Sequence, residues 1–274
     1  MNGFLGFDAY SPDQIAERVE SLGVTKARLP ILKTLMLGAL AGAFIGLGAL
    51  YFTVVASDTQ LSFGVARVLG GLAFSLGLVL VVIAGAELFT GNNLLVMAWA
   101  DDRISTLEVL RNWVLVFVAN AAGAIGLAVI VYLSHHADMN KHAVADAYLR
   151  IAAAKTALPF AQAFYKGVLC NLLVCLAVWI ALAGHSVTDK IIAIVFPISA
   201  FVAAGFEHSV ANMYFIPLGI MLKNDGGVPA DVNTATLDWA GFAGNLLPVT
   251  LGNIVGGSVM VALVYYVIYR RPKT

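Results

Sequence analysis

Two stretches of the sequence, Gly85-Ala-Glu-Leu-Phe-Thr-Gly-Asn92 and Gly205-Phe-Glu-His-Ser-Val-Ala-Asn212, interrupt long apolar segments and repeat one pattern. In each stretch a glycine is followed by one variable residue and a glutamate, and an asparagine ends the stretch. The surrounding segments, Val68–Ala100 and Ile191–Met221, are far longer than the roughly 20 residues that a helix needs to cross a hydrocarbon core of about 30 Å. Each segment is therefore expected to be a membrane helix that breaks at its polar interruption.

The composition is that of a membrane protein. Of the 274 residues, 60% are hydrophobic and 12% are charged, against roughly 45–50% and about 25% in a soluble domain. The 16 Lys and Arg residues balance the 16 Asp and Glu residues, so no excess of positive charge is present to bind nucleic acid. The two cysteines, Cys170 and Cys175, share one apolar segment and supply neither a disulfide framework nor a zinc ligand set. No metal and no cofactor is expected.

Six apolar segments are expected to cross the membrane, and they divide into two homologous groups of three. The six are Thr34–Ala56, Val68–Ala100, Trp113–Leu133, Ala161–Ala183, Ile191–Met221 and Leu246–Tyr269. A second repeated pattern supports the division, because Asn120-x-x-Gly123 in the third segment matches Asn253-x-x-Gly256 in the sixth. Three spans followed by three homologous spans insert in opposite orientations, so the sequence predicts inverted repeats whose broken helices meet near the bilayer midplane. This plan is typical of transporters and channels.

The predicted organisation has five parts. They are an N-terminal amphipathic segment (1–33), the first repeat (34–133), a periplasmic or extracellular connection (134–160), the second repeat (161–269) and a cytoplasmic tail (270–274). In the first part, Ser11-Pro12-Asp13 predicts the start of a short helix, because serine caps helices and proline favours their first position.

Lysine and arginine residues outside the spans indicate the orientation. Ten lie on the side of both termini and five on the other: Arg18, Lys26, Arg28, Lys33, Arg103, Arg111, Lys190, Arg270, Arg271 and Lys273 against Arg67, Lys141, Arg150, Lys155 and Lys223. Because positively charged loops remain in the cytoplasm, both termini are expected there, with the protein in the inner (plasma) membrane.

Four ionisable side chains lie within the spans, namely Glu87, Lys166, Glu207 and His208. Such groups are costly inside hydrocarbon, so each is a candidate for a transport pathway. The alternative for His208 is a neutral core histidine, and the alternative for Lys166 is a solvated side chain that reaches the interface. Glu87 and Glu207 are expected mainly to accept hydrogen bonds from backbone N–H groups that their own helix breaks set free.

Further candidates flank the breaks. Thr90 offers a hydroxyl group at midplane depth, although threonine in a membrane helix often bonds only to its own backbone. The apolar residues near the breaks are typical of ordinary packing, but apolar rings can also gate a pore by excluding water. These residues are Phe74, Leu78, Leu88, Phe89 and Phe201.

The segment Val82-Ile-Ala-Gly-Ala-Glu-Leu-Phe-Thr-Gly91 resembles the first signature of the formate/nitrite transporter family. Gly167-Val-Leu-Cys-Asn-Leu-Leu-Val-Cys-Leu-Ala177 resembles the second signature. Phe206-Glu-His-Ser-Val-Ala-Asn-Met213 and Pro248-Val-Thr-Leu-Gly-Asn-Ile-Val-Gly-Gly257 are similar to later conserved stretches of the family. The resemblance extends over all six segments.

The resemblance implies a homopentamer with one pore in each subunit and an aquaporin-like helical fold. It also implies small monovalent weak-acid anions as substrates, with formate first, nitrite or hydrosulfide as alternatives, and acetate and lactate in the same class. The family's central histidine falls on His208, its threonine on Thr90 and the asparagine of its second signature on Asn171. Its apolar constrictions fall on Phe74, Leu78, Leu88, Phe89 and Phe201. Lys166 lies where some branches carry lysine and others an acid.

The sequence thus predicts an anion channel or transporter, and not an enzyme, in which His208 relays a proton. Desolvation favours a neutral resting imidazole, whereas an arriving anion favours the imidazolium, whose proton can pass to the substrate. The neutral acid then crosses the apolar rings. The paired Asn-Pro-Ala motifs of water and glycerol facilitators are absent. The alternative from another class is an intramembrane enzyme, but the sequence has no Gly-x-Ser-x-Gly and no His-Glu-x-x-His motif.

Overall fold

The computed structural model describes residues 9–271, and every regular element within this range is helical. The elements are α1 (Pro12–Ala27), α2 (Ile31–Ala56), α3 (Phe63–Ala84), η1 (Gly91–Leu94), α4 (Leu95–Ala100), α5 (Thr106–Leu133), η2 (His136–Asp138), α6 (Ala143–Thr156), α7 (Phe160–Ala181), α8 (Val187–Ala204), α9 (Ser209–Asp225), α10 (Trp239–Ile254), η3 (Val255–Leu263) and α11 (Val264–Tyr269). The segments η1 and η2 are 3₁₀ turns, and η3 is a π-helix that continues α10 into α11. Residues 1–8 of the predicted N-terminal segment and 272–274 of the predicted tail lie outside the described residues.

Six helices of the described chain are long and apolar enough to span a bilayer, as predicted. They are α2, α3, α5, α7, α8 and the continuous helix Trp239–Tyr269. The second and fifth spans break at the predicted glycines, since α3 ends at Gly85 (φ 81°) and α8 ends at Gly205 (φ 74°). Glycine adopts this left-handed conformation without steric cost, which is why it ends a helix in each repeat.

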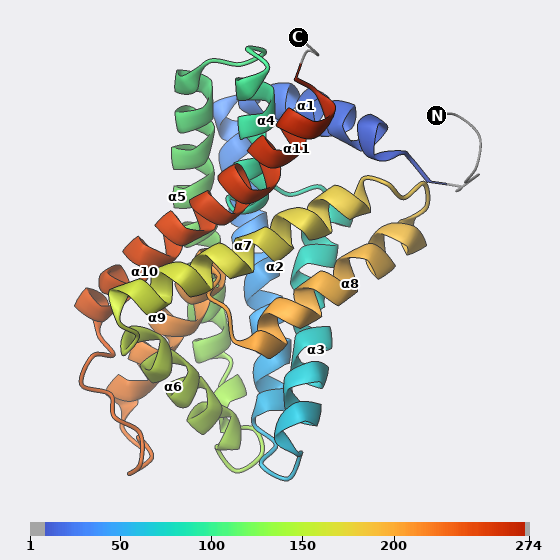
Figure 1. Ribbon diagram of the computed structural model, residues 1–274. Coiled ribbons are helices and arrows are strands. Elements are labelled where there is room, and N and C mark those ends of the chain that lie inside the picture. The colour runs from blue at the N-terminus through green and yellow to red at the C-terminus, as the bar shows by residue number, and fades with distance from the viewer. Residues whose placement is uncertain (1–8, 272–274) are drawn as a thin grey trace.

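The two repeats are inverted. Their broken spans differ in the part that follows the break. In the first repeat the chain continues through η1 into the six-residue helix α4, whereas in the second it enters the 17-residue helix α9. Figure 1 shows α1 and the end of α11 at one end of the molecule, with α6 at the other end. The chain leaves the first break toward α1 and the second break toward α6, because α4 lies against α1 and α9 packs on α6.

Glycines allow helix pairs within each repeat to cross closely. A Cβ atom at Gly42 of α2 would collide with the backbone oxygen of Asn120 in α5, and one at Gly252 of α10 would collide with that of Phe164 in α7. Small residues at such crossings let backbones approach. The crossings place Asn120 and Asn253 beside the helix breaks, where their side chains form hydrogen bonds with the backbone.

Two helices outside the spans cover the ends of the molecule. Ser11 caps α1 together with Gln14, and α1 lies against α4. The connection between the repeats contains η2 and α6, and α6 packs on α9 and carries Lys155 near its end. These helices bring charged residues from outside the spans to the helix breaks.

Candidate functional site

Two cavities lie beside the helix breaks, one at each break. One, of about 250 Å³, is lined by residues of α2, α3, α6, α7, α8 and α9. We call it the α6-side cavity. The other, of about 280 Å³, is lined by residues of α1, α3, the first break, η1 and α7. We call it the α1-side cavity.

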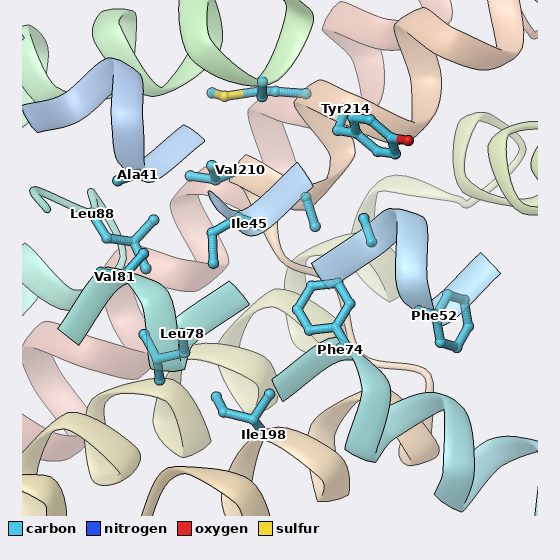
Figure 2. Packing of buried hydrophobic residues seen from close by; sticks show 14 of the residues in the cluster. Ala41, Ile45, Phe52, Phe74, Leu78, Val81, Leu88, Ile198, Val210 and Tyr214 are labelled. Carbon is cyan, nitrogen blue, oxygen red and sulfur yellow. The ribbon is translucent and has the colours of Figure 1, made fainter. Parts of the chain in front are cut away.

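An apolar layer lies where these cavities meet the helix breaks. Phe74 and Phe201 line the α6-side cavity and pack edge to face with ring centroids 5.6 Å apart, and the ring of Phe201 stacks on His208 at 6.0 Å. Leu78 and Leu88 line the α1-side cavity. Figure 2 shows Phe74, Leu78 and Leu88 in one packed cluster of buried hydrophobic residues. An ion that crossed this layer would lose its water.

Phe89, the remaining predicted constriction residue, lines neither cavity. It is buried and packs edge to face on Trp113 and Phe117, with ring centroids 6.2 and 5.0 Å away. Its backbone N–H is nevertheless part of the first break, because it donates to the side chain of Asn120.

His208 and Thr90 join the two breaks directly. Nε2 of His208 lies 3.0 Å from Oγ1 of Thr90, and both side chains are buried. His208 is also the N-cap of α9, because its Nδ1 accepts the N–H of Ala211 at 3.1 Å. Nδ1 must carry the lone pair for that bond, so we assign the ring proton to Nε2, which donates to Thr90. The proton on the Thr90 hydroxyl is then available to another acceptor.

The position of His208 favours a neutral ring. A proton on Nδ1 would displace the N–H of Ala211 and leave the first turn of α9 without its cap. The helix N-terminus also carries partial positive charge, which opposes a cation there. Both effects favour the neutral resting state that the sequence predicts.

Asn120 and Asn253 satisfy the backbone of the two breaks in the same way. Asn120 accepts the N–H of Phe89 at 2.9 Å and donates to the carbonyl of Glu87 at 2.9 Å. Asn253 accepts the N–H of Ser209 at 3.0 Å and donates to the carbonyl of Glu207 at 3.0 Å. The repeated Asn-x-x-Gly pattern thus marks the residues that hold the breaks open.

A polar quartet lies at the first break, beside the α1-side cavity. Nζ of Lys26 pairs with Oε1 of Glu87 at 2.9 Å, and Nδ2 of Asn92 donates to Oε2 of Glu87 at 2.7 Å. Asn92 also donates to Oδ1 of Asn112 at 3.0 Å. Asn112 closes the quartet by donating to the backbone oxygen of Lys26 at 3.1 Å.

The second break carries the same quartet, beside the α6-side cavity. Nζ of Lys155 pairs with Oε1 of Glu207 at 2.9 Å, and Nδ2 of Asn212 donates to Oε2 of Glu207 at 2.7 Å. Asn212 also donates to Oδ1 of Asn245 at 2.7 Å, and Asn245 donates to the backbone oxygen of Lys155 at 2.8 Å. These four contacts match those of the first quartet, but Nζ of Lys26 also donates to Oδ1 of Asn92 at 3.0 Å, whereas Oδ1 of Asn212 has no hydrogen-bond partner within residues 9–271.

The expectation that Glu87 and Glu207 accept hydrogen bonds from the N–H groups of their own breaks is wrong. Their carboxylates instead bind a lysine and an asparagine. The reason lies in the chemistry of the groups, since an amide side chain both donates and accepts and can satisfy an N–H and a carbonyl together. A buried carboxylate needs a cation, which Lys26 and Lys155 provide.

Lys26 and Lys155 are not among the site residues predicted from the sequence, because they lie outside the spans. A signal was present, since Lys26-x-x-x-Pro30 and Lys155-x-x-x-Pro159 each come directly before the first span of a repeat. Asn112 and Asn245 likewise precede Asn120 and Asn253 by the same spacing. A comparison of the two halves at every polar position identifies both quartets.

Lys166 and Asn171, both on α7, have different surroundings. Lys166 lines the α6-side cavity, and its backbone oxygen accepts the N–H of Glu207 at 3.2 Å. Asn171 is fully buried and lines neither cavity. Its Nδ2 donates to the backbone oxygens of Thr90 at 3.2 Å and Asn253 at 2.7 Å. Asn171 therefore holds the backbone of Thr90 in place from a position outside both cavities.

Comparison with known proteins agrees with this architecture. Residues 13–267 match the family described as Formate/nitrite transporter. A protein of Escherichia coli (strain K12) named Formate channel FocA is 38% identical over 97% of this chain and 96% of its own length. A protein of Methanothermobacter thermautotrophicus named Probable formate transporter is 41% identical over 97% of this chain and 99% of its own length.

A solved structure has the same fold. It is described as a pentameric formate channel with formate bound, and it is 40% identical with a TM-score of 0.81 over 87% of this chain and 97% of that chain. The family match covers both repeats, both helix breaks and the quartets beside them. The chain therefore belongs to the formate/nitrite transporter family.

Proposed function

We propose that this protein is a channel for formate and related small monovalent weak-acid anions, and that it works as a homopentamer with one pathway in each subunit. The observation that carries the proposal is the His208–Thr90 pair, buried next to an apolar layer between two cavities. The names of its relatives support formate as the first substrate. Nitrite and hydrosulfide are the alternatives within the same class.

The apolar layer requires that the anion be neutralised before it crosses. Formate entering the α6-side cavity meets Phe74 and Phe201, where a bare carboxylate is poorly solvated. A hydrogen bond from the Thr90 hydroxyl satisfies part of the lost hydration. Transfer of a proton to the carboxylate removes the charge and lets formic acid pass.

The geometry supports a proton relay through His208 with the following order of steps. A neutral ring cannot give up its Nε2 proton without becoming an anion, so a second proton first enters at Nδ1, from water in the α6-side cavity that His208 lines. This step breaks the bond to the N–H of Ala211. The Nε2 proton then passes to Thr90, whose hydroxyl proton passes to the carboxylate. Loss of the Nδ1 proton and uptake of one at Nε2 restore the resting tautomer.

The orientation and the five-part organisation complete the proposal. Residues 1–33 and 270–274 lie in the cytoplasm, and the connection 134–160 lies outside the inner (plasma) membrane. The excess of Lys and Arg on the side of the termini supports this orientation. The α1-side cavity then opens to the cytoplasm and the α6-side cavity to the outside.

A flux assay in proteoliposomes tests the proposal. Stopped-flow recordings compare formate, nitrite and hydrosulfide side by side, with empty liposomes as the control. We expect formate to enter without chemical change and faster than the other two anions. Entry of none of the three would refute the channel, and turnover of a substrate by the detergent-solubilised protein would favour an enzyme instead.

A further inference from the structure

The two quartets carry the same formal charges, so they do not make the formal charges of the two cavities different. In each quartet the charge of one lysine cancels that of one glutamate. Lys26 and Glu87 are the charged residues that line the α1-side cavity, which is formally neutral. The α6-side cavity is lined by Arg67, Lys155, Lys166 and Glu207, three positive charges against one negative, which leaves a formal charge of +2.

The guanidinium group of Arg67 donates hydrogen bonds to two backbone oxygens. Its Nε donates to the backbone oxygen of Ala203 at 2.9 Å, and its Nη2 donates to that of Val202 at 2.5 Å. Both oxygens belong to the last turn of α8, the end of a helix that carries partial negative charge. The guanidinium group of Arg67 therefore stabilises the end of α8 at the second break.

The ammonium group of Lys166 has no such partner. Within residues 9–271, Nζ of Lys166 forms no hydrogen bond and no ion pair, although the side chain is half-buried in the cavity wall. The backbone beneath it is held firmly. Its oxygen accepts the N–H of Glu207, and a Cβ atom at Gly167 would collide with the backbone of α10. A fixed backbone and an unpaired cation make Lys166 the free positive charge of this cavity.

The first repeat shows what stands at the equivalent position. The N–H of Glu207 donates to the backbone oxygen of Lys166, and the N–H of Glu87 donates to that of Leu37, both at 3.2 Å. Lys166 and Leu37 are each followed by a glycine that faces a helix crossing, Gly167 and Gly38. The second repeat therefore has a lysine where the first repeat has a leucine, and Leu37 does not line the α1-side cavity.

We propose that Lys166 is a specificity-determining residue that binds the arriving anion in the α6-side cavity and makes anion entry from this side more efficient than entry from the α1 side. The inference rests on the proposed anion pathway. The walls around Lys166 include Phe52, Ile151 and Phe215, and apolar walls focus the field of a charge on the cavity. Monovalent carboxylates and nitrite are the ligands of this site, because a single ammonium group pairs with one negative charge.

Sided flux measurements test the proposal. Right-side-out and inside-out membrane vesicles containing the full-length protein separate entry through the two cavities, and initial rates are measured against formate concentration. For the wild type we expect half-saturation at a several-fold lower concentration from the α6 side. Lys166→Met should raise the α6-side value several-fold, toward the α1-side value, and leave the α1-side value unchanged. Added salt should reduce the difference between the sides in the wild type.

Two matched variants separate the local charge from a general one. Lys166→Arg keeps the charge and should retain the sidedness. Lys141→Gln removes an exposed positive charge from the same end of the molecule but outside the cavity, and it should change neither value. An unchanged α6-side value in a correctly assembled Lys166→Met protein, or an equal loss on both sides, would overturn the proposal.

A second measurement does not depend on flux. The purified protein is acetylated with N-hydroxysuccinimidyl acetate, an uncharged reagent, and the modification of each lysine is followed by mass spectrometry. We expect formate and nitrite to slow modification of Lys166 but not of Lys141. Absence of protection with formate flux intact refutes the role of Lys166 alone. Protection without any formate flux supports the anion site and refutes the channel.

Discussion

Oγ1 of Thr90 lies 3.0 Å from Nε2 of His208, and this contact joins the helix break of the first repeat to that of the second. Inverted repeats supply two similar backbones at the midplane, but here they carry unlike residues. His208 corresponds to Leu88 in the first repeat when the two Gly-x-Glu patterns are aligned. The second break therefore contributes a titratable ring that also caps a helix. The first break has a leucine at the equivalent position, and its Thr90 contributes the hydroxyl group that pairs with His208.

Replacement of His208 by Asn should flatten the pH dependence of formate flux. Asn cannot titrate, but it is a favoured N-cap residue and can accept the N–H of Ala211 in place of Nδ1. The break should therefore remain folded. The measurement is stopped-flow uptake by proteoliposomes between about pH 5 and 8, where an ordinary histidine changes its charge. A variant with the pH profile of the parent would show that His208 has only a structural role.

Loss of the Thr90 hydroxyl should slow formate flux at every pH. Thr90→Val keeps the shape of the side chain but leaves Nε2 of His208 without its acceptor, and an unpaired buried group costs about 1–3 kcal/mol. If this cost falls on the transition state, flux should decrease about tenfold or more.

Thr90→Ser is the matched control for this experiment, because it restores the hydroxyl without the methyl group. Its flux in the same stopped-flow assay should lie close to that of the parent. Equal flux in the Val variant and the parent would remove Thr90 from the relay.

The fold was predictable because the signals that determine it are local. Gly85 and Gly205 stand in polar interruptions of segments too long for one span, and both end a helix in the left-handed conformation. Lys26 and Lys155 lie outside these segments, and the repeated Lys-x-x-x-Pro pattern does not show that each lysine reaches its glutamate once α1 or α6 folds over the end of a cavity. Tertiary contacts of this kind are not visible in hydrophobic periodicity.

The site was predictable only in part, because a residue's exposure to a cavity depends on the direction in which its side chain faces in the folded protein. Phe89 and Leu88 are neighbours in sequence, yet Leu88 lines the α1-side cavity and Phe89 packs on Trp113. The roles of the glutamates were misjudged for a related reason. The backbone of each break is satisfied by an asparagine from a different span, and only the packing of α5 and α10 brings that asparagine near.

Removal of the Asn253 side chain should destabilise the folded protein. Asn253→Ala leaves the N–H of Ser209 and the carbonyls of Gly167 and Glu207 without their partner, inside the membrane. Each unsatisfied group costs about 1–3 kcal/mol, so the midpoint of thermal unfolding in detergent should fall by several degrees. Asn224→Ala, at an exposed position near the end of α9, should shift the midpoint little. Equal midpoints for both variants would contradict the role assigned to Asn253.

Shortening the side chains of the apolar layer should allow larger carboxylates to pass. Phe201 packs between Phe74 and His208, and Leu78 lines the α1-side cavity. Truncation of either to Ala leaves space that water can enter, and a wetter constriction admits larger solutes. We expect Phe201→Ala and Leu78→Ala to raise the flux of acetate and lactate relative to formate.

The control for this last prediction is Phe89→Ala, which removes a ring of the same size from a residue that lines neither cavity. It should destabilise the protein, because Phe→Ala in a packed core costs about 3–5 kcal/mol, but the ratio of lactate to formate flux should stay that of the parent. If all three variants change the ratio alike, the effect is a general loosening of the fold. If Phe201→Ala and Leu78→Ala keep the ratio of the parent in correctly assembled protein, these two residues serve packing alone and the pathway narrows elsewhere.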